Sequence, residues 1–193
     1  MNQDTIHIRP ASALDHLAVA PLIVQALDDL AAKYTNSKDP LNLIPDIGLF
    51  FVQEKNMYSY AQTLVAETGN WVVGSITAYD GADFIAFRDP FIQHVRSKYG
   101  FNLPLVPETQ AGEYYIDTLS VIPSQQGKGI GALLIRSMLQ HAAALGHKRV
   151  GLLVEATNSA AKKLYSHIGF KKAGDKQLLS STYDHLVFDL ADL

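Results

Sequence analysis

An α/β fold is predicted for this sequence, as one domain over residues 1–193 with a mixed, mostly antiparallel central sheet flanked by helices. The length of 193 residues suits a single domain that buries one large core. Apolar residues make up 48% of the chain and charged residues 18%, a balance that excludes disorder for most of it. Segments in which apolar and polar residues alternate are interspersed with segments of helical periodicity, as expected when strands and helices are mixed.

The first half of the chain is expected to form a strand, two helices and a hairpin, followed by a less regular stretch. Ile6 and Ile8 alternate with polar residues, and Ser12 or Asp15 can cap the first helix. Gly69 lies in the turn of the hairpin. The expected elements are a strand at 5–9, helices at about 12–33 and 46–59 separated by a break at 40–45, strands at 63–67 and 71–79, a short helix within 82–99, and a loop at 102–112.

The second half is more regular. Ile130, Leu134 and Met138 follow the spacing of an amphipathic helix, which Gly146 is expected to end. The segment 149–156 is almost continuously apolar, which indicates a strand buried on both faces. The expected elements are a strand at 113–122, a helix from about 129 to 146, a strand at 149–156, a helix from Asn158 or Ser159 to about His167 that Gly169 closes, and an antiparallel pair at 176–179 and 182–190.

Charge, cysteine and histidine content narrow the possible functions. The net charge is -3, whereas a surface that neutralises many phosphates would be basic, so no nucleic-acid partner is expected. The chain has no cysteine, which excludes disulfides, thiolate metal sites and a thiol nucleophile. None of the seven histidines has His-x-His or His-Glu-x-x-His spacing, so no metal site is expected. Without a signal peptide or an apolar stretch long enough to span a bilayer, we expect a cytoplasmic protein without a membrane partner.

The most informative segment is a glycine-rich turn between an expected strand and an amphipathic helix. Gly127, Gly129 and Gly131 allow the main chain to approach a ligand closely and to adopt positive φ. The N-terminus of the helix that follows presents unpaired N–H groups and a partial positive charge. The turn is therefore suited to bind a phosphate or pyrophosphate group.

Other interpretations of this turn are weaker. The glycines could simply shape a tight turn, but one turn rarely needs three of them. A P-loop is excluded because Gly-x-x-x-x-Gly-Lys-Ser/Thr does not occur. The fingerprint of a nicotinamide-dependent oxidoreductase is met in degenerate form by Gly127, Gly129 and Ala132. That fingerprint turns directly off its strand, whereas here five residues separate Val121 from Gly127, and only about 60 residues follow the turn.

Two blocks of residues resemble a known family. The first is Leu119-Ser120-Val121-x-Pro123-x-x-Gln126-Gly127-Lys128-Gly129-Ile130-Gly131, followed by Leu133-Leu134. The second is Val154-Glu155-Ala156-x-Asn158-x-x-Ala161-x-x-Leu164-Tyr165-x-x-x-Gly169-Phe170. Both are similar to blocks of the GNAT superfamily of N-acetyltransferases, whose pattern Arg/Gln-x-x-Gly-x-Gly/Ala is met by Gln126, Gly129 and Gly131. The resemblance implies a single GNAT-like domain; its motifs span about residues 113–172, and the expected element order extends it over the chain.

The resemblance implies an acetyl-CoA-dependent acyltransferase that moves an acetyl group to a primary amine of a small molecule or peptide by direct attack. In the family, the strand here at 113–122 parts from the strand at 149–156, and the acetyl-pantetheine arm lies in the gap. Main-chain groups of Leu119 and Val121 would pair with this arm, those of residues 126–132 would hold the pyrophosphate, and the Asn158 side chain would bond the arm. The implied acetyl-CoA-binding residues are Leu119, Ser120, Val121, Gln126, Gly127, Lys128, Gly129, Ile130, Gly131, Ala132 and Asn158.

Two residues are expected to carry the chemistry. By its position in the family motif, Tyr165 is the acid that gives a proton or a strong hydrogen bond to the departing thiolate; otherwise it is a core aromatic. Asp117 is a candidate base or ammonium-binding group, and regular alternation would place it on the same side as Leu119 and Val121. A structural ion pair is the plainer explanation for Asp117. A main-chain N–H near Val121 is expected to stabilise the oxyanion.

Further candidates for the acceptor cleft are Tyr79, Glu108, Glu113, Tyr115, Tyr183 and His185, although ordinary packed or exposed positions explain each of them as well. Acidic residues such as Glu113 and Asp117 favour a cationic acceptor, whose identity the sequence leaves open. The alternative function is a non-catalytic acyl-CoA-binding sensor or interaction module, which the presence of Tyr165 and the complete glycine turn disfavours. Exposed strand edges are compatible with a homodimer.

Overall fold

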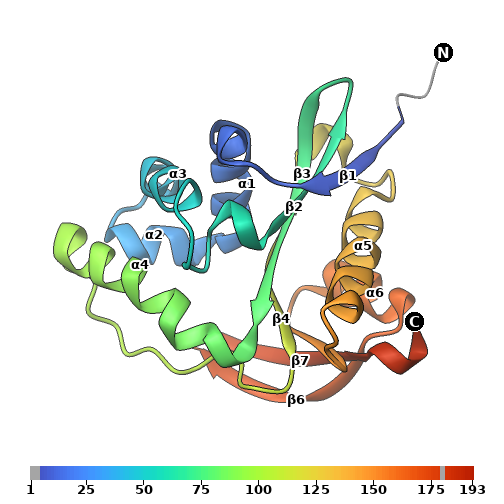
Figure 1. The fold of residues 1–193 in the computed structure, drawn as a ribbon. Coiled ribbons are helices and arrows are strands. Elements are labelled where there is room, and N and C mark those ends of the chain that lie inside the picture. The colour runs from blue at the N-terminus through green and yellow to red at the C-terminus, as the bar shows by residue number, and fades with distance from the viewer. Residues whose placement is uncertain (1–4, 179–180) are drawn as a thin grey trace.

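The structure is a computed structural model that describes residues 5–178 and 181–193, and it contains a seven-stranded sheet with helices on both faces (Figure 1). The strand order is β1-β2-β3-β4-β5-β7-β6. Among the described residues, β4 and β5 form the one parallel pair, and the other neighbours are antiparallel. The strands are β1 (His7–Pro10), β2 (Thr63–Thr68), β3 (Trp71–Asp80), β4 (Tyr114–Val121), β5 (Arg149–Glu155), β6 (Lys171–Leu178) and β7 (Ser181–Asp189). The predicted fold class is thereby confirmed.

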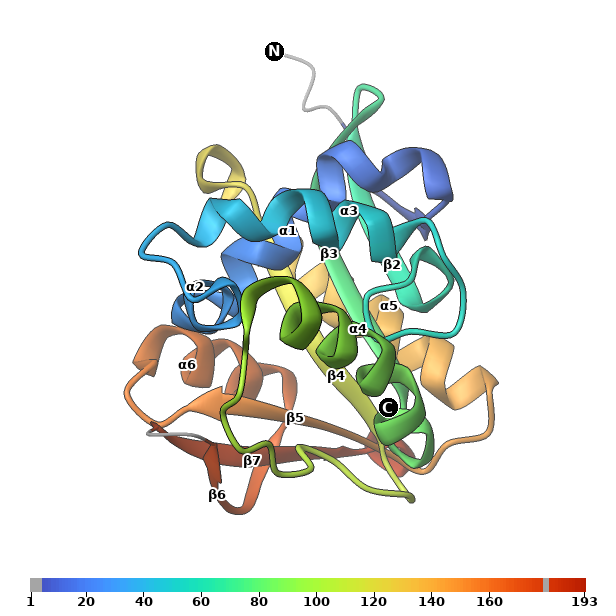
Figure 2. The same ribbon diagram turned by 90° about the vertical axis from the view of Figure 1, so that its left-hand side faces the viewer.

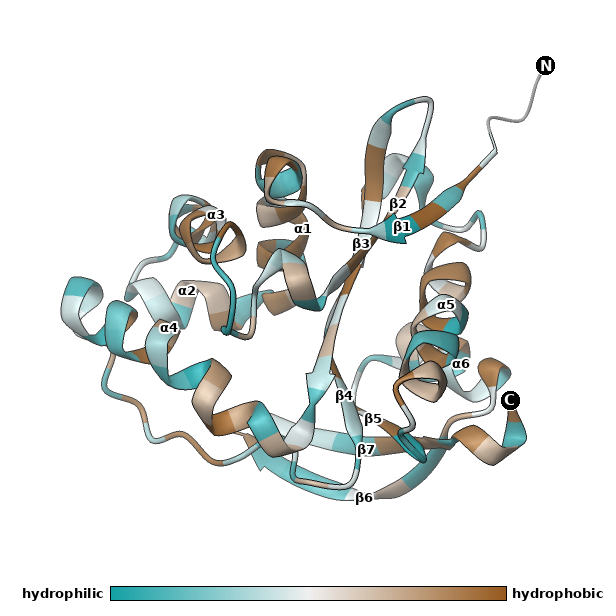
Figure 3. Ribbon diagram, viewed as in Figure 1, coloured by the Kyte–Doolittle hydropathy of each residue, from teal (hydrophilic) through white to brown (hydrophobic). Residues whose placement is uncertain are grey.

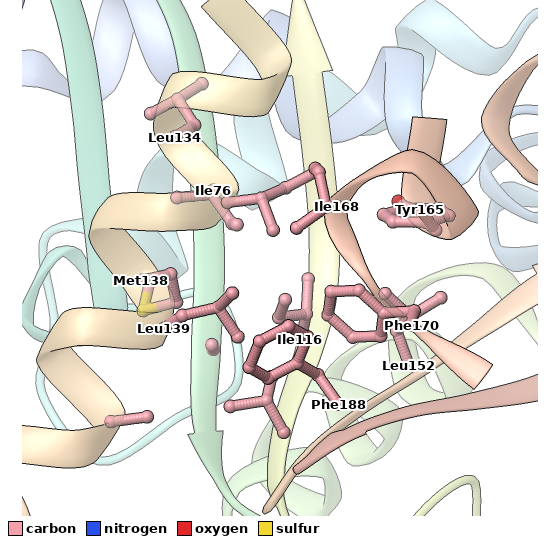
Figure 4. Close-up of a cluster of buried hydrophobic side chains, with 14 of the residues drawn as sticks. Ile76, Ile116, Leu134, Met138, Leu139, Leu152, Tyr165, Ile168, Phe170 and Phe188 are labelled. Atoms are coloured by element: carbon pink, nitrogen blue, oxygen red, sulfur yellow. The ribbon is translucent and has the colours of Figure 1, made fainter. Parts of the chain in front are cut away.

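The helices form two layers, each over its own hydrophobic cluster. One cluster joins β3 and β4 to α1, α2, α3 and α4, and the other joins the opposite face to α5 and α6 (Figures 2 and 4). Apolar residues dominate α1 and the middle of β3, whereas the end of α4 near Tyr99 is polar (Figure 3). The helices are α1 (His16–Leu27), α2 (Asp29–Thr35), α3 (Ile44–Phe51), α4 (Phe84–Tyr99), α5 (Ile130–Ala144) and α6 (Ser159–Ile168). In the part of the chain described here, no helix is both long and apolar enough to cross a bilayer.

Three helix predictions in the first half were wrong in extent. The first helix is broken at Asp28, whose φ of 48° is incompatible with a continuous right-handed helix. The second helix, α3, ends at Phe51 rather than near residue 59, and Lys55 with φ 58° lies in the irregular segment that follows. The expected short helix in 82–99 is the 16-residue α4, which contains Pro90. Its buried Phe91 anchors the helix despite the backbone hydrogen bond that a proline removes.

The last hairpin also begins earlier than expected. β6 starts at Lys171 rather than Lys176, and its side chains are mostly exposed because it is an edge strand of the sheet. A polar edge strand lacks the apolar alternation that would reveal it in the sequence. Leu179, at the end of the predicted strand, lies outside the described residues.

β4 carries two features that shape the middle of the sheet. Thr77 of β3 pairs with Thr118 and Ala78 pairs with Ile116, so Asp117 is the extra residue of a β-bulge. In addition, β4 pairs with β5 only from Tyr114 to Ile116, although both strands continue. Beyond the bulge the two strands diverge, as the family resemblance implied (Figure 2).

The bulge corrects one expectation about side-chain direction. Regular alternation predicted that Asp117 shares a face with Leu119 and Val121. Instead Leu119 and Val121 pack against the α5–α6 cluster, while Tyr115, before the bulge, packs in the cluster of α1 to α4. The inserted residue shifts the alternation by one position, so odd-numbered residues change face at the bulge.

Candidate active site

A cavity of about 300 Å³ opens where β4 and β5 part. Asp117, Thr118 and Leu119 line it from β4, and residues 153–155 line it from β5. The remaining walls come from the α1–α2 junction, residues 57–58, the loop before β4, α6 and the β6–β7 hairpin. Of the sequence-predicted residues, the cavity brings together Asp117, Leu119, Asn158 and Tyr165, with Glu108, Tyr115 and Tyr183 from the wider set.

The main chain of β4 faces the gap at two of the expected positions. The N–H of Ile122 donates to the Val73 carbonyl at 2.9 Å, which fixes the side of the strand that bonds to β3. Because this direction alternates along an antiparallel pair, the main-chain groups of Leu119 and Val121 point away from β3, toward the gap. The Val121 carbonyl already accepts bonds from Gln25 Nε2 at 3.0 Å and Gln126 Nε2 at 2.9 Å.

Ser120 lies differently from its neighbours. Its side chain is buried and accepts a hydrogen bond from Gln25 Nε2 at 2.7 Å, on the α1 side of the sheet. By the same alternation its main chain faces β3. Its side chain thus ties β4 to α1 and does not face the gap. Gln25 itself was not anticipated, because a single polar residue in an apolar helix gives no motif.

The glycine turn has the conformation that the sequence predicted. Gly127 and Gly129 have φ of 74° and 83°, and Gly129 is the N-cap of α5, so side chains would be strained at both positions. Gly131 lies in the first turn of α5, where a Cβ would make only an ordinary contact of 3.6 Å with Leu164 of α6. Lys128 is exposed and donates to Gln125. Ile130 is buried in the α5–α6 cluster with Ala132 packed against it, so only their main chains are available to a ligand.

Asn158 and Tyr165 approach the cavity from α6. Asn158 Oδ1 accepts from the N–H of Ala161 at 3.0 Å and caps the helix, which leaves its side-chain N–H groups available as donors. Tyr165 is 9% exposed and packs beside Phe170 at the edge of the α5–α6 cluster (Figure 4). Burial raises the pKa of Tyr165 to about 12. Tyr165 is therefore both a core aromatic and a neutral phenol at the cavity wall.

Asp117 is held by a buried tyrosine. Tyr79 Oη donates to Asp117 Oδ2 at 2.5 Å, and Tyr79 itself is fully buried behind the cavity rather than in its wall. Burial, followed by the nearby negative charge of Glu108, raises the pKa of Asp117 to about 8, against a smaller lowering by the Tyr79 hydrogen bond. Asp117 therefore exchanges its proton close to neutral pH.

Glu108 enters the cavity from the loop before β4. Its Oε2 accepts a hydrogen bond from Tyr115 Oη at 2.9 Å, and burial raises the pKa of its carboxyl. Lys176 Nζ donates to the main-chain carbonyl of Glu108 at 2.6 Å and fastens the loop to β6. The sequence offered only weak support for Glu108, since loops have no periodicity.

Glu113 and His185 do not reach this cavity, contrary to their suggested place in the acceptor cleft. Glu113 is 6% exposed and accepts from Thr109 Oγ1 at 2.6 Å, while its other oxygen lies 2.9 Å from His185 Nε2. A Cβ on Gly151 would collide with the Glu113 carboxylate, so the glycine makes room for this carboxylate. This cluster fixes the loop that carries Glu108.

Comparisons with known proteins agree with this geometry. Residues 25–170 match the model of the acetyltransferase (GNAT) family. The mycothiol acetyltransferase of Gordonia bronchialis is 42% identical over 108 residues, which cover 54% of this chain and 34% of that protein. The mycothiol acetyltransferase of Mycobacteroides abscessus is 33% identical over 112 residues, covering 55% and 37%. This chain thus spans about a third of the length of these relatives.

The fold similarity extends over nearly the whole chain. The crystal structure of an N-acetyltransferase from Staphylococcus aureus Mu50 has a TM-score of 0.82 and 28% sequence identity. The match covers 94% of this chain and 100% of that one.

Proposed function

This chain belongs to the acetyltransferase (GNAT) family, and from that premise we propose that it transfers an acetyl group from acetyl-CoA to a primary amine by direct attack. The acceptor is a small molecule or a peptide amine. The observation that carries the proposal is the cavity at the splayed strands, because it joins Leu119 of the acetyl-CoA motif to Asp117 and Tyr165.

The residues present fit acetyl-CoA. Main-chain groups of Leu119 face the gap between β4 and β5, where a pantetheine arm can replace the missing strand neighbour. The amide N–H groups of Asn158 are available to the same arm, and the main-chain N–H groups of residues 127–132 are available to the pyrophosphate. The N–H of Gln126 already donates to the Pro123 carbonyl. Acetyl-CoA supplies the thioester, whose C–S bond breaks as the new C–N bond forms.

Asp117 is the proposed base. The acceptor amine has to be neutral to attack, yet a lysine-like amine has a pKa of about 10.4, which is about 6.5 above the pKa of an ordinary aspartate. The raised pKa of Asp117, about 8, narrows this gap to about 2.4 and brings proton transfer within reach of catalysis. The hydrogen bond from Tyr79 orients the carboxyl.

Leu119 and Tyr165 are proposed to stabilise the charges that develop. The N–H of Leu119 faces the gap, and Leu119 lines the cavity whereas Val121 does not, so the N–H of Leu119 is the better placed oxyanion donor. Tyr165, with a pKa of about 12, is a weaker acid than a thiol, whose pKa is about 8.5. It therefore donates a hydrogen bond to the departing sulfur, and the proton accepted by Asp117 reaches the thiolate through solvent. The products are the N-acetylated amine and CoA.

Ligand binding and turnover test the proposal. Calorimetry with acetyl-CoA, CoA and NAD(P) is expected to show micromolar binding of acetyl-CoA. Thiol release from acetyl-CoA across a panel of primary amines is expected to yield an N-acetylated product detectable by mass spectrometry. Binding of NAD(P) without acetyl-CoA would overturn the proposal. Acetyl-CoA binding without turnover on any amine would favour the non-catalytic alternative.

A further inference from the structure

The cavity holds a second carboxyl, that of Glu108, which has no direct contact with a reacting atom in the proposed transfer. Among the described residues, the Glu108 carboxyl has one hydrogen-bond partner, the hydroxyl of Tyr115. A carboxylate can accept about four hydrogen bonds, so most of this capacity is open to a ligand. Asp117 likewise has one partner, Tyr79. The cavity therefore contains two carboxyl groups whose remaining oxygen lone pairs face no protein donor in the described chain.

A buried hydroxyl at the cavity wall adds a sign of a ligand. The hydroxyl of Thr118 has no hydrogen-bond partner among the described residues, and Thr118 is 4% exposed and lines the cavity. An unsatisfied buried hydroxyl is destabilising, and a polar ligand in the cavity can offset that cost.

Acidic residues outnumber basic residues in the lining of the cavity. Its charged lining residues are Asp28, Asp29, Lys33, Glu108, Asp117 and Glu155. Arg88 and Lys176 are the cations that face Glu108 from outside the wall. Arg88 is paired with Asp89 at 3.0 Å, and Lys176 bonds the main-chain carbonyl of Glu108 rather than its carboxyl. Neither Arg88 nor Lys176 therefore pairs with the Glu108 carboxyl inside the cavity. A cationic ligand is favoured at that position.

Apolar residues also line the cavity. They include Leu30, Met57, Leu105 and Val106, together with the ring of Tyr34. These side chains suit the methylene chain of an alkylamine. The cavity thus combines apolar residues with separate carboxyl groups on β4 and on the preceding loop.

The charge that the acceptor carries during the reaction distinguishes a monoamine from a diamine. The reacting amine at Asp117 has to lose its proton before it attacks, so it contributes no positive charge at that moment. A second ammonium on the same molecule keeps its charge and pairs with Glu108 throughout. We propose that the acceptor is an alkyl diamine or polyamine, with the reacting amine at Asp117 and a second ammonium held by Glu108. This inference rests on the proposed acetyl transfer.

The experiment compares monoamines with α,ω-diamines of equal chain length, such as butylamine with 1,4-diaminobutane, and includes spermidine. A hydrogen bond to a charged group contributes about 1.5–3 kcal/mol, so kcat/KM should be about 10- to 100-fold higher for the preferred diamine than for its monoamine. Glu108→Gln should lower the ratio of kcat/KM for the diamine to kcat/KM for the monoamine to about 1. The ratio is the readout because the charge of Glu108 also raises the pKa of Asp117 and so affects the turnover of both amines. Glu54→Gln, an exposed substitution of the same type, is the matched control.

The outcomes are distinguishable. Turnover of monoamines and diamines with equal kcat/KM in the unmodified protein overturns the diamine proposal alone, without reference to any variant. Equal losses for both amine classes in Glu108→Gln make Glu108 a loop-positioning residue and also overturn it. Absence of turnover with every amine, despite acetyl-CoA binding, overturns the transfer proposal and this one with it.

Discussion

Glu113 directly precedes β4 and Asp117 lies within β4, four residues later, yet the surroundings of the two carboxyl groups differ in kind. Burial pushes the pKa of Glu113 upward, but hydrogen bonds from His185 and Thr109 outweigh it, and the pKa is lowered. At Asp117, burial and the charge of Glu108 dominate over a single tyrosine bond, and the pKa is raised. The hydrogen-bond donors around Glu113 keep its carboxylate ionised, which suits a structural role. Asp117 has a single donor, and its carboxyl is therefore suited to exchange a proton.

The largest expected effect is on turnover at Asp117. Asp117→Asn keeps the size of the side chain but removes the base, so kcat should fall by about 10²- to 10⁴-fold. The affinity for acetyl-CoA, measured by calorimetry, should be unchanged because the main-chain contacts of β4 remain. A variant that transfers acetyl groups at the normal rate would place Asp117 in the same structural class as Glu113.

A smaller loss is expected at Tyr165. Tyr165→Phe removes one hydrogen-bond donor to the departing sulfur and preserves the packing against Phe170, so kcat should fall by about 10- to 100-fold. Stopped-flow thiol release gives this rate, and thermal unfolding checks the packing. Unchanged turnover would assign Tyr165 to the core alone.

Glu113→Gln tests the structural side of the comparison. The variant weakens the bonds to His185 and Thr109 and should lower the free energy of unfolding by about 1–3 kcal/mol at neutral pH. Because the folded-state pKa of Glu113 is lowered, its stabilisation is present above the ordinary value of 4.5 and is lost as pH falls through the folded pKa. Urea unfolding should therefore show the difference between variant and original shrinking in acid. A pH-independent difference would contradict this assignment.

Asp117 should show the opposite trend in stability. Its folded-state pKa of about 8 lies above the ordinary 3.8, so the folded protein binds the extra proton between these values. Stability relative to Asp117→Asn should then be greatest in acid and decrease as pH rises toward and through about 8. Urea unfolding at pH 5 and pH 9 measures it. If the difference in the free energy of unfolding between the two proteins is the same at both pH values, folding does not raise the pKa of the Asp117 carboxyl.

The sequence was sufficient for features that depend on neighbouring residues. The hairpin around Gly69, the start of α5 after Gly129 and the end of α6 at Gly169 all follow from local conformational preferences. The family motifs likewise placed Tyr165 and Leu119 at one cavity.

Features set by distant contacts were not predictable. The bulge at Asp117 is a property of the pairing between β4 and β3. Alternation along β4 alone cannot reveal it and therefore assigned the Asp117 side chain to the wrong face of the sheet. Glu108 lies in a loop whose position depends on Lys176, 68 residues away, and on the contact of Glu113 with His185, 72 residues away. The length of α4 depends on tertiary packing of residues such as Phe91 that outweighs Pro90.

The pH profile of acetyl transfer tests the central claim most directly. Thiol release from acetyl-CoA with one accepted amine should be measured for the original protein and Asp117→Asn between about pH 6 and 10, a range around the pKa values of carboxyl and amine. The account predicts that kcat for the original protein rises with pH through an apparent pKa near 8, and that this rise is absent from the much slower variant. An identical rising limb and rate in Asp117→Asn would contradict the assignment of Asp117 as the base.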